Sequence, residues 1–201
     1  ILTQHLSYHK SNLHALRLYT GSYNSLIELY KGNVSLASCN LWDSDTNTYN
    51  IPYVRRLLPG TSCILIRLFS RKQGFYVAKG NPKNITDWNN LTNPTIRMIN
   101  REKGSGVRVL LDENLKKLNI LHTSINGYDR ECFSHFAVAS AVSRGEADIA
   151  IGNEKTSYQV ENIDFIPLQN EQCDLVIKKE DINNPIFKSI LEILRSKEFL
   201  M

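Results

Sequence analysis

The sequence has no pair of cysteines at the spacing of a metal site. Its four cysteines form no Cys-x-x-Cys pair and lie far apart, at Cys39, Cys63, Cys132 and Cys173. Widely spaced cysteines of this kind are typical of buried thiols in a reducing compartment rather than of disulfides or zinc ligands. We therefore expect no metal-ligating residues and no cofactor.

Long apolar runs and blocks of one charge are also missing. The sequence contains no run of about 18 apolar residues, which is the length that a membrane-spanning helix requires. The 24 basic and 20 acidic residues are scattered and leave a net charge of +4, without the basic clusters of a nucleic-acid-binding face. We expect no membrane insertion and no direct contact with nucleic acid. The charge mildly favours anionic ligands.

The start of the chain lacks the pattern of a secretion signal. It begins at Ile1 and alternates polar with apolar residues through Leu18, without a charged start or a long apolar stretch. A chain that begins with Ile is a mature product or an excised fragment, so a leader or an upstream domain stays possible. We expect a cytoplasmic location, with a periplasmic or membrane-attached extracellular one as the alternative.

Three enzyme signatures are absent. The segment from Gly104 to Arg108 lacks the first glycine of a Gly-x-Ser-x-Gly elbow, and no Gly-Lys-Ser/Thr follows a glycine-rich loop. Nothing in the sequence brings Asp43 and Asp45, or Glu171 and Asp174, together as acid and base, and we interpret these four as surface carboxylates. We expect no catalytic residues and no enzymatic activity.

Strands and helices are predicted to alternate along the whole chain. A strand at 16–20, the turn Gly21-Ser22 and a helix ending near Gly32 form the first unit, and a strand at 95–99, the turn Gly104-Ser105-Gly106 and a helix at 107–118 form the second. Other predicted strands are 34–37, 64–69, 74–78, 125–128, 147–151, 163–168 and 174–177, and other helices are 134–144 and one opening at Pro185. This order predicts an α/β fold with mainly parallel sheets flanked by helices.

The two Gly-Ser turns are the strongest candidates for binding an anion. Each turn points unpaired backbone N–H groups of a helix N-terminus beyond the end of a strand. Gly21 and Gly106 allow close approach to the backbone, and the hydroxyls of Ser22 and Ser105 add donors. The rival interpretation is that both serines only cap their helices.

Further candidates lie near the predicted strand ends. Arg108 is one turn into the second helix and Arg101 precedes its turn, so either could neutralise an anion, although solvated surface arginines are the rival interpretation. Arg71 and Gln73 lie at a strand boundary, where α/β sheets often contact ligands. His135 opens an Ala-rich helix, where a lone histidine is more often structural.

Many short motifs resemble one known family. They are Gly21-Ser22 with Ser25-Leu26, Tyr49-Asn50 with Pro52 and Val54, Arg71-x-Gln73-Gly74, Gly80-Asn81-Pro82, Asn100-Arg101-x-x-Gly104-Ser105-Gly106-x-Arg108-x-Leu110-Leu111-Asp112, Gly127-Tyr128, Glu131, His135, Ala137-Val138-Ala139, Ala141-Val142, Gly145-x-Ala147-Asp148 and Asp164-Phe165-x-Pro167-Leu168. Together they resemble periplasmic-binding-protein-like substrate-binding domains related to molybdate-binding proteins. Such domains are often fused to a helix-turn-helix DNA-binding domain.

The resemblance implies a two-lobed type II binding-protein fold with a ligand cleft between the lobes. Lobe one would comprise residues 1–78 and 168–201, and lobe two residues 79–167. Ser22 and Ser105 would approach one ligand from opposite lobes, and the binding set would include Asn40 and Tyr128. Asn40 replaces a histidine that is usual in the family and Val107 replaces a threonine, so two side chains near the expected ligand differ from the family pattern.

The sequence therefore predicts a ligand-binding module. The leading hypothesis is a sensor domain of a transcriptional regulator that binds an oxyanion, molybdate or tungstate. The alternative is an extracytoplasmic solute-binding protein of a molybdate ABC transporter. A third hypothesis, from another class, is an enzyme or binding module of molybdopterin cofactor metabolism.

Overall fold

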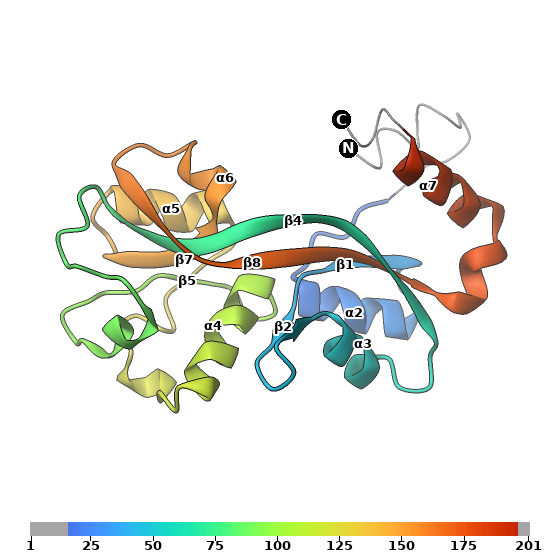
Figure 1. The fold of residues 1–201 in the computed structure, drawn as a ribbon, viewed down its shortest axis with the longest axis horizontal. Coiled ribbons are helices and arrows are strands. Elements are labelled where there is room, and N and C mark those ends of the chain that lie inside the picture. The colour runs from blue at the N-terminus through green and yellow to red at the C-terminus, as the bar shows by residue number, and fades with distance from the viewer. Residues whose placement is uncertain (1–15, 197–201) are drawn as a thin grey trace.

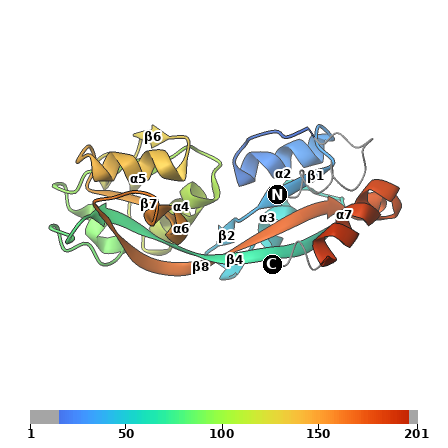
Figure 2. The same cartoon turned by 90° about the horizontal axis from the view of Figure 1, so that it is seen from above.

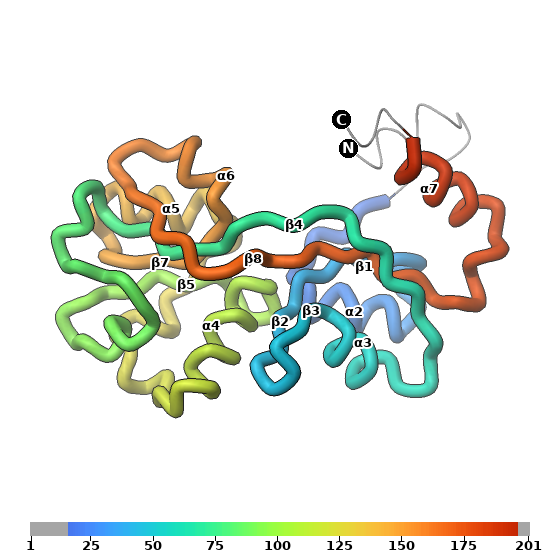
Figure 3. The backbone as a smooth tube through the Cα atoms, viewed as in Figure 1, coloured from blue at the N-terminus to red at the C-terminus, as the bar shows by residue number. Residues whose placement is uncertain are grey.

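Two lobes joined by two long strands make up the structure, a computed structural model that describes residues 16–196 (Figure 1). The strands are β4 (Cys63–Ala78) and β8 (Ile163–Lys178), which pair with each other and pass through both lobes. The tube in Figure 3 follows them side by side from one lobe to the other. The α/β class and the two-lobed arrangement predicted from the sequence are confirmed.

The first lobe packs helices on both faces of one half of this sheet. Its elements are α2 (Ser22–Lys31), β1 (Leu36–Cys39), β2 (Trp42–Asp43), β3 (Thr48–Tyr49), α3 (Ile51–Leu57), η3 (Lys179–Asn183) and α7 (Pro185–Arg195). Leu26 of α2 packs in one apolar cluster with Val176 of β8, whereas Phe187 of α7 packs in another with Leu175. Because successive strand residues point to opposite faces, α2 and α7 cover opposite sides of the sheet.

The second lobe repeats this arrangement on the other half of the long strands. Its elements are η1 (Trp88–Thr92), β5 (Asn100–Arg101), α4 (Gly106–Lys117), η2 (His122–Ser124), β6 (Glu131–Cys132), α5 (His135–Ser143), β7 (Ile149–Asn153) and α6 (Glu154–Ser157). Phe75 packs with Leu110 on the α4 side, and Tyr76 packs with Val138 on the α5 side. Seen from above, α2 and α5 lie on the same side of the long strands (Figure 2).

The prediction of mainly parallel sheets is wrong. The main sheet has the order β1-β8-β4-β7, and all three pairings in it are antiparallel. Parallel pairing is found among the described residues only between β5 and β6 and at the bridge of Met98 with Ile149. Strands covered by helices on both faces have continuous apolar runs whatever their direction, so the apolar pattern could not reveal it.

Several element boundaries also differ from the prediction. Residues 16–20 and 125–128 form no strand, and residues 95–99 contribute only the Met98 bridge. The predicted strands 64–69 and 74–78 are one strand, as are 163–168 and 174–177, while the short helix α3 was missed. The four predicted helices are present. The lobe boundaries at 78/79 and 167/168 stay a prediction, and residues 1–15 and 197–201 of the first lobe lie outside the described residues.

Asn50 holds the first lobe together at the start of α3. Its backbone is left-handed, with φ of 65°, and its side chain is fully buried. The side-chain oxygen accepts the N–H of Leu41 at 2.7 Å, and the amide nitrogen donates to Asp174 at 2.7 Å and to the carbonyl of Gln172 at 3.1 Å. Asp174 also pairs with Arg67 of β4. One amide thus links the β2–β3 segment to both long strands.

We predict that Asn50→Ala lowers the free energy of unfolding by about 3 kcal/mol, because it leaves buried polar groups without partners and keeps a left-handed backbone. Chemical denaturation monitored by circular dichroism measures this. The matched control is Asn119→Ala, at an exposed asparagine with φ of 54°, which should cost about 1 kcal/mol. Equal losses in the two variants would contradict the role given to the amide.

Candidate ligand-binding site

The two Gly-Ser turns meet where the lobes join. Gly21 is the N-cap of α2, and the N–H of Tyr23 donates to the carbonyl of Gly104 at 2.9 Å. A Cβ atom on Gly21 would collide with this carbonyl, so only glycine allows the two backbones to lie this close. The N-terminal ends of α2 and α4 therefore lie together at the junction of the lobes (Figure 1). We call this junction the seam.

A chain of polar side chains lies beneath the turns. The hydroxyl of Ser22 donates to the Asn40 side-chain oxygen, the Asn40 amide donates to Glu171, and Arg71 forms an ion pair with the other oxygen of Glu171. A Cβ atom on Gly106 would collide with the Asn40 side chain. The structure thus brings together Ser22, Asn40, Arg71 and Gly106, four residues that the sequence analysis proposed.

Burial and nearby charges determine the charge states of the polar groups beneath the turns. Burial alone would lower the pKa of Arg71, but the nearby Glu171 carboxylate outweighs it, so the pKa of Arg71 is raised. Burial, followed by the Glu171 carboxylate, raises the pKa of the neighbouring Cys173 thiol to about 12. Arg71 and Glu171 therefore form a compensated ion pair, and Cys173 is a neutral thiol. The positive charge of Arg71 is not left over for an anion.

The helix N-termini at the seam offer backbone donors. The hydroxyl of Ser105 accepts the N–H of Arg108 at 3.2 Å, so Ser105 caps α4, as the rival interpretation held. Ser22 forms no such cap on α2. Within the described residues, no acceptor takes up the N–H groups of Gly106 and Val107. These groups carry the partial positive charge of the α4 N-terminus.

Gln73 is a buried amide without partners. It has no exposed surface, and neither its Nε2 nor its Oε1 atom has a hydrogen-bond partner among the described residues. The amides beside it are engaged elsewhere: Asn153 with Thr156 at 3.0 Å, and Gln169 with the Tyr49 hydroxyl at 2.7 Å. Each unpaired buried polar group costs about 1–3 kcal/mol. This is a cost that a bound ligand could remove.

His135 and Arg101 add little net charge near the seam. The Nδ1 atom of His135 is buried without a partner, and burial, followed by the charges of Arg101 and Arg71, lowers the pKa of His135 to about 3. The ring is therefore neutral at pH 7. Arg101 pairs with Glu102 at 2.7 Å.

Arg108 and Tyr128 belong to a network inside the second lobe. The Arg108 guanidinium is stacked on the Tyr128 ring, with 4.1 Å to its centroid, and pairs with Glu131 at 2.9 Å and Asp112 at 3.3 Å. The Tyr128 hydroxyl donates to Asp112 at 2.7 Å. One guanidinium nitrogen, Nη2, has no partner among the described residues. The role of this pair in ligand binding stays a prediction.

The prediction of surface carboxylates is wrong for three of the four residues. Asp43, Glu171 and Asp174 are buried, whereas Asp45 is exposed. Glu171 is the seam residue that the sequence analysis missed as a candidate. Its register partner across β4 and β8 is Arg71, and this charge match between two separated polar segments was the one available signal.

A second contact joins the lobes at the other end of α4. Glu113 accepts hydrogen bonds from the N–H of Ser44 at 3.0 Å and from the Tyr53 hydroxyl at 3.0 Å. Lys116 pairs with Asp45 at 2.7 Å. The β2–β3 segment and α3 of the first lobe therefore hold α4 independently of the seam.

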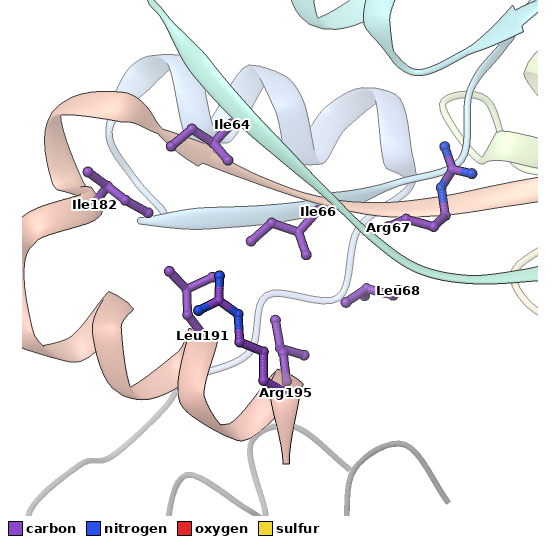
Figure 4. Close-up of a pocket in the computed structure, with 8 residues that line it drawn as sticks. Ile64, Ile66, Arg67, Leu68, Ile182, Leu191 and Arg195 are labelled. Carbon is purple, nitrogen blue, oxygen red and sulfur yellow. The ribbon is translucent and has the colours of Figure 1, made fainter. Parts of the chain in front are cut away.

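Other kinds of site are not supported. Among residues 16–196, no cluster of His, Cys, Asp and Glu could hold a metal ion, and no helix is long and apolar enough to cross a membrane. A groove of about 400 Å³ lies between β4 and α7 (Figure 4). It is mostly apolar and none of the predicted site residues line it; the lining residues are Ile64, Ile66, Arg67, Leu68, Ile182, Leu191, Leu194 and Arg195.

Comparison with known families agrees with this geometry. The family described as the PBP superfamily domain matches residues 3–195. The chain belongs to the PBP superfamily. Domains of this superfamily bind small ligands, and the PBP domain described here is a small-ligand-binding module.

Sequence and structural relatives refine the comparison. YvgK of Bacillus subtilis (strain 168) is 47% identical over 184 residues, which cover 92% of this PBP domain but only 59% of YvgK. The shikimate-bound effector-binding domain of QuiR has a TM-score of 0.67 at 18% identity, covering 96% of this chain and 86% of that one. A phosphate-bound protein from Clostridium perfringens, described as a phosphate ABC transporter substrate-binding protein, has a TM-score of 0.69 at 13% identity, covering 98% and 88%. At these low sequence identities, the two structures show only that this chain shares their fold.

We predict that Gly21→Ala holds the lobes apart, because its methyl group collides with the Gly104 carbonyl while φ of −66° suits alanine. Small-angle X-ray scattering should give a larger radius of gyration than for the wild type. The control is Gly60→Ala, where φ of 71° imposes strain but nothing lies within 4 Å, and it should leave the radius unchanged. A wild-type radius in Gly21→Ala would contradict a seam closed by this contact.

Proposed function

We propose that this PBP domain binds a small oxyanion at the seam and closes around it. The observation that carries the proposal is the meeting of two helix N-termini from opposite lobes, where the N–H groups of Gly106 and Val107 have no acceptor among the described residues. Backbone N–H groups at helix N-termini favour anions without a full positive charge. The Cys173 thiol donates to the Glu171 carboxylate at 3.7 Å, but burial raises the pKa of this thiol to about 12, so it is a poor nucleophile at neutral pH.

Tetrahedral oxyanions suit this donor arrangement, and the sequence resemblance makes molybdate and tungstate the first to test. Arg71 is compensated by Glu171, so attraction would come from the helix dipoles and the backbone N–H groups. Binding would favour the closed arrangement, because the donors of the two lobes come together only there.

We predict that isothermal titration calorimetry with molybdate, tungstate, sulfate and phosphate gives saturable heat with at least one of them. Gly21→Ala should weaken that binding at least 10-fold, since it separates the two groups of donors. Gly60→Ala is the control and should bind as the wild type does. If none of the four anions binds, the oxyanion proposal is wrong.

We further propose that closure acts as a signal in a cytoplasmic regulator. This domain spans 59% of YvgK, so a chain of that length has room for a second domain, and QuiR uses the same fold for effector binding. The transporter alternative draws on the phosphate-bound relative.

We predict that a longer natural chain containing this segment binds its own promoter DNA with an affinity that the bound anion changes several-fold. Fluorescence anisotropy with and without the anion measures this, and Gly21→Ala in the longer chain should abolish the change. A cleaved leader peptide, or DNA affinity insensitive to the anion, would favour the transporter receptor instead.

A further inference from the structure

One face of β4 changes from apolar to polar as the strand approaches the seam. Val77 and Phe75 pack in the cluster under α4, together with Ile149 and Ile151 of β7. Alternation along the strand places Gln73 next on this face, and its register partner on β7 is Asn153. Gln73 is thus the first polar residue of the row, facing the side that α4 covers.

The amide of Gln73 requires a partner that both donates and accepts. Its Nε2 and Oε1 atoms are buried and have no partner among the described residues. Turning the amide over exchanges the two atoms but leaves one donor and one acceptor. A ligand made only of acceptors could satisfy Nε2 and would leave Oε1 unpaired.

The carboxylate of Glu171 can only accept hydrogen bonds, and both of its oxygens already have donors, Asn40 on one and Arg71 on the other. It is 2% exposed and lies on β8 two residues beyond Gln169, the register partner of Gln73. Arg71 compensates its charge, and Arg101 is compensated by Glu102. A fully deprotonated dianion close to this carboxylate would be repelled by it, whereas a hydroxyl on the ligand could donate to a carboxylate oxygen.

We propose that the ligand is an oxyanion that carries a hydroxyl group, such as hydrogen phosphate, and that Gln73 and Glu171 select it over fully deprotonated oxyanions. The proposal rests on the oxyanion site proposed above. It narrows the expected ligands of that site by excluding molybdate, tungstate and sulfate. Hydrogen phosphate and hydroxylated carboxylates share this chemistry, namely several acceptor oxygens and one or more donors.

Phosphate and sulfate form the sharpest pair of probes. At about pH 8 both are tetrahedral dianions, and they differ by one proton. Calorimetry on the wild-type chain should show phosphate binding roughly 100-fold or more tightly than sulfate, since a site built to accept a hydroxyl proton rejects an analogue that lacks it. Molybdate and tungstate should bind as weakly as sulfate. Shikimate is a hydroxylated carboxylate. Its binding would show that the ligand belongs to this class rather than to the phosphates.

The variant Gln73→Met removes the amide but keeps an unbranched side chain of similar length. It should lower the phosphate-to-sulfate ratio at least several-fold, with Glu171 keeping the rest of the preference, and it should raise the melting temperature, because an unpaired buried amide is replaced by an apolar group. The matched control is Gln169→Met, at the neighbouring amide that is already bonded to Tyr49. This control should keep the ratio of the wild type.

The outcomes separate this inference from the proposed function. Preferential binding of phosphate or shikimate that depends on Gln73 supports it. Sulfate, molybdate or tungstate binding as tightly as phosphate and shikimate overturns it and leaves the oxyanion site standing, as does an unchanged ratio in Gln73→Met. If none of the five probes binds, the proposed function itself fails.

Discussion

The contact between the N–H of Tyr23 and the carbonyl of Gly104 is the constraint on which the rest of the seam depends. It joins two backbones with no side chain between them, since Gly21 presents no Cβ atom to the opposite turn. It also brings Asn40 so close to Gly106 that a Cβ atom on Gly106 would collide with the Asn40 side chain. A single methyl group is large enough to remove the arrangement.

The polar groups beneath that contact differ in whether they have hydrogen-bond partners. We expect a group left without partners to lower stability and to serve ligand binding. Glu171 has an ion pair and an amide donor, so its burial is compensated. Gln73 is buried as deeply and has neither a donor nor an acceptor among the described residues. Proteins tolerate a local cost of this kind mainly at sites that a ligand completes. The two neighbouring amides, both engaged, show that the surrounding strands could have satisfied such a group.

Local signals in the sequence predicted local structure well. The Gly-Ser turns, the Ala-rich helix α5 and the Pro-initiated α7 follow from capping and periodicity within each segment. The direction of the strands and the continuity of β4 could not be predicted from such signals. Arg67 and Arg71 interrupt the apolar pattern of β4. They are paired with Asp174 and Glu171, which lie about 100 residues away in the sequence. Such partners exist only after folding, which is also why Glu171 was taken for a surface residue.

The two ends of α4 are held to the first lobe in different ways, and this affects what a ligand has to contribute. Glu113 binds Ser44 and Tyr53 without involving any seam donor. A ligand shifts the lobes only by the difference between its affinities for the closed and open forms. The Glu113 contact and the Tyr23–Gly104 bond stabilise the closed form, and the ligand supplies the remaining free energy that makes this form dominant. Its interactions with Gln73 and Glu171 can then serve mainly to discriminate one oxyanion from another.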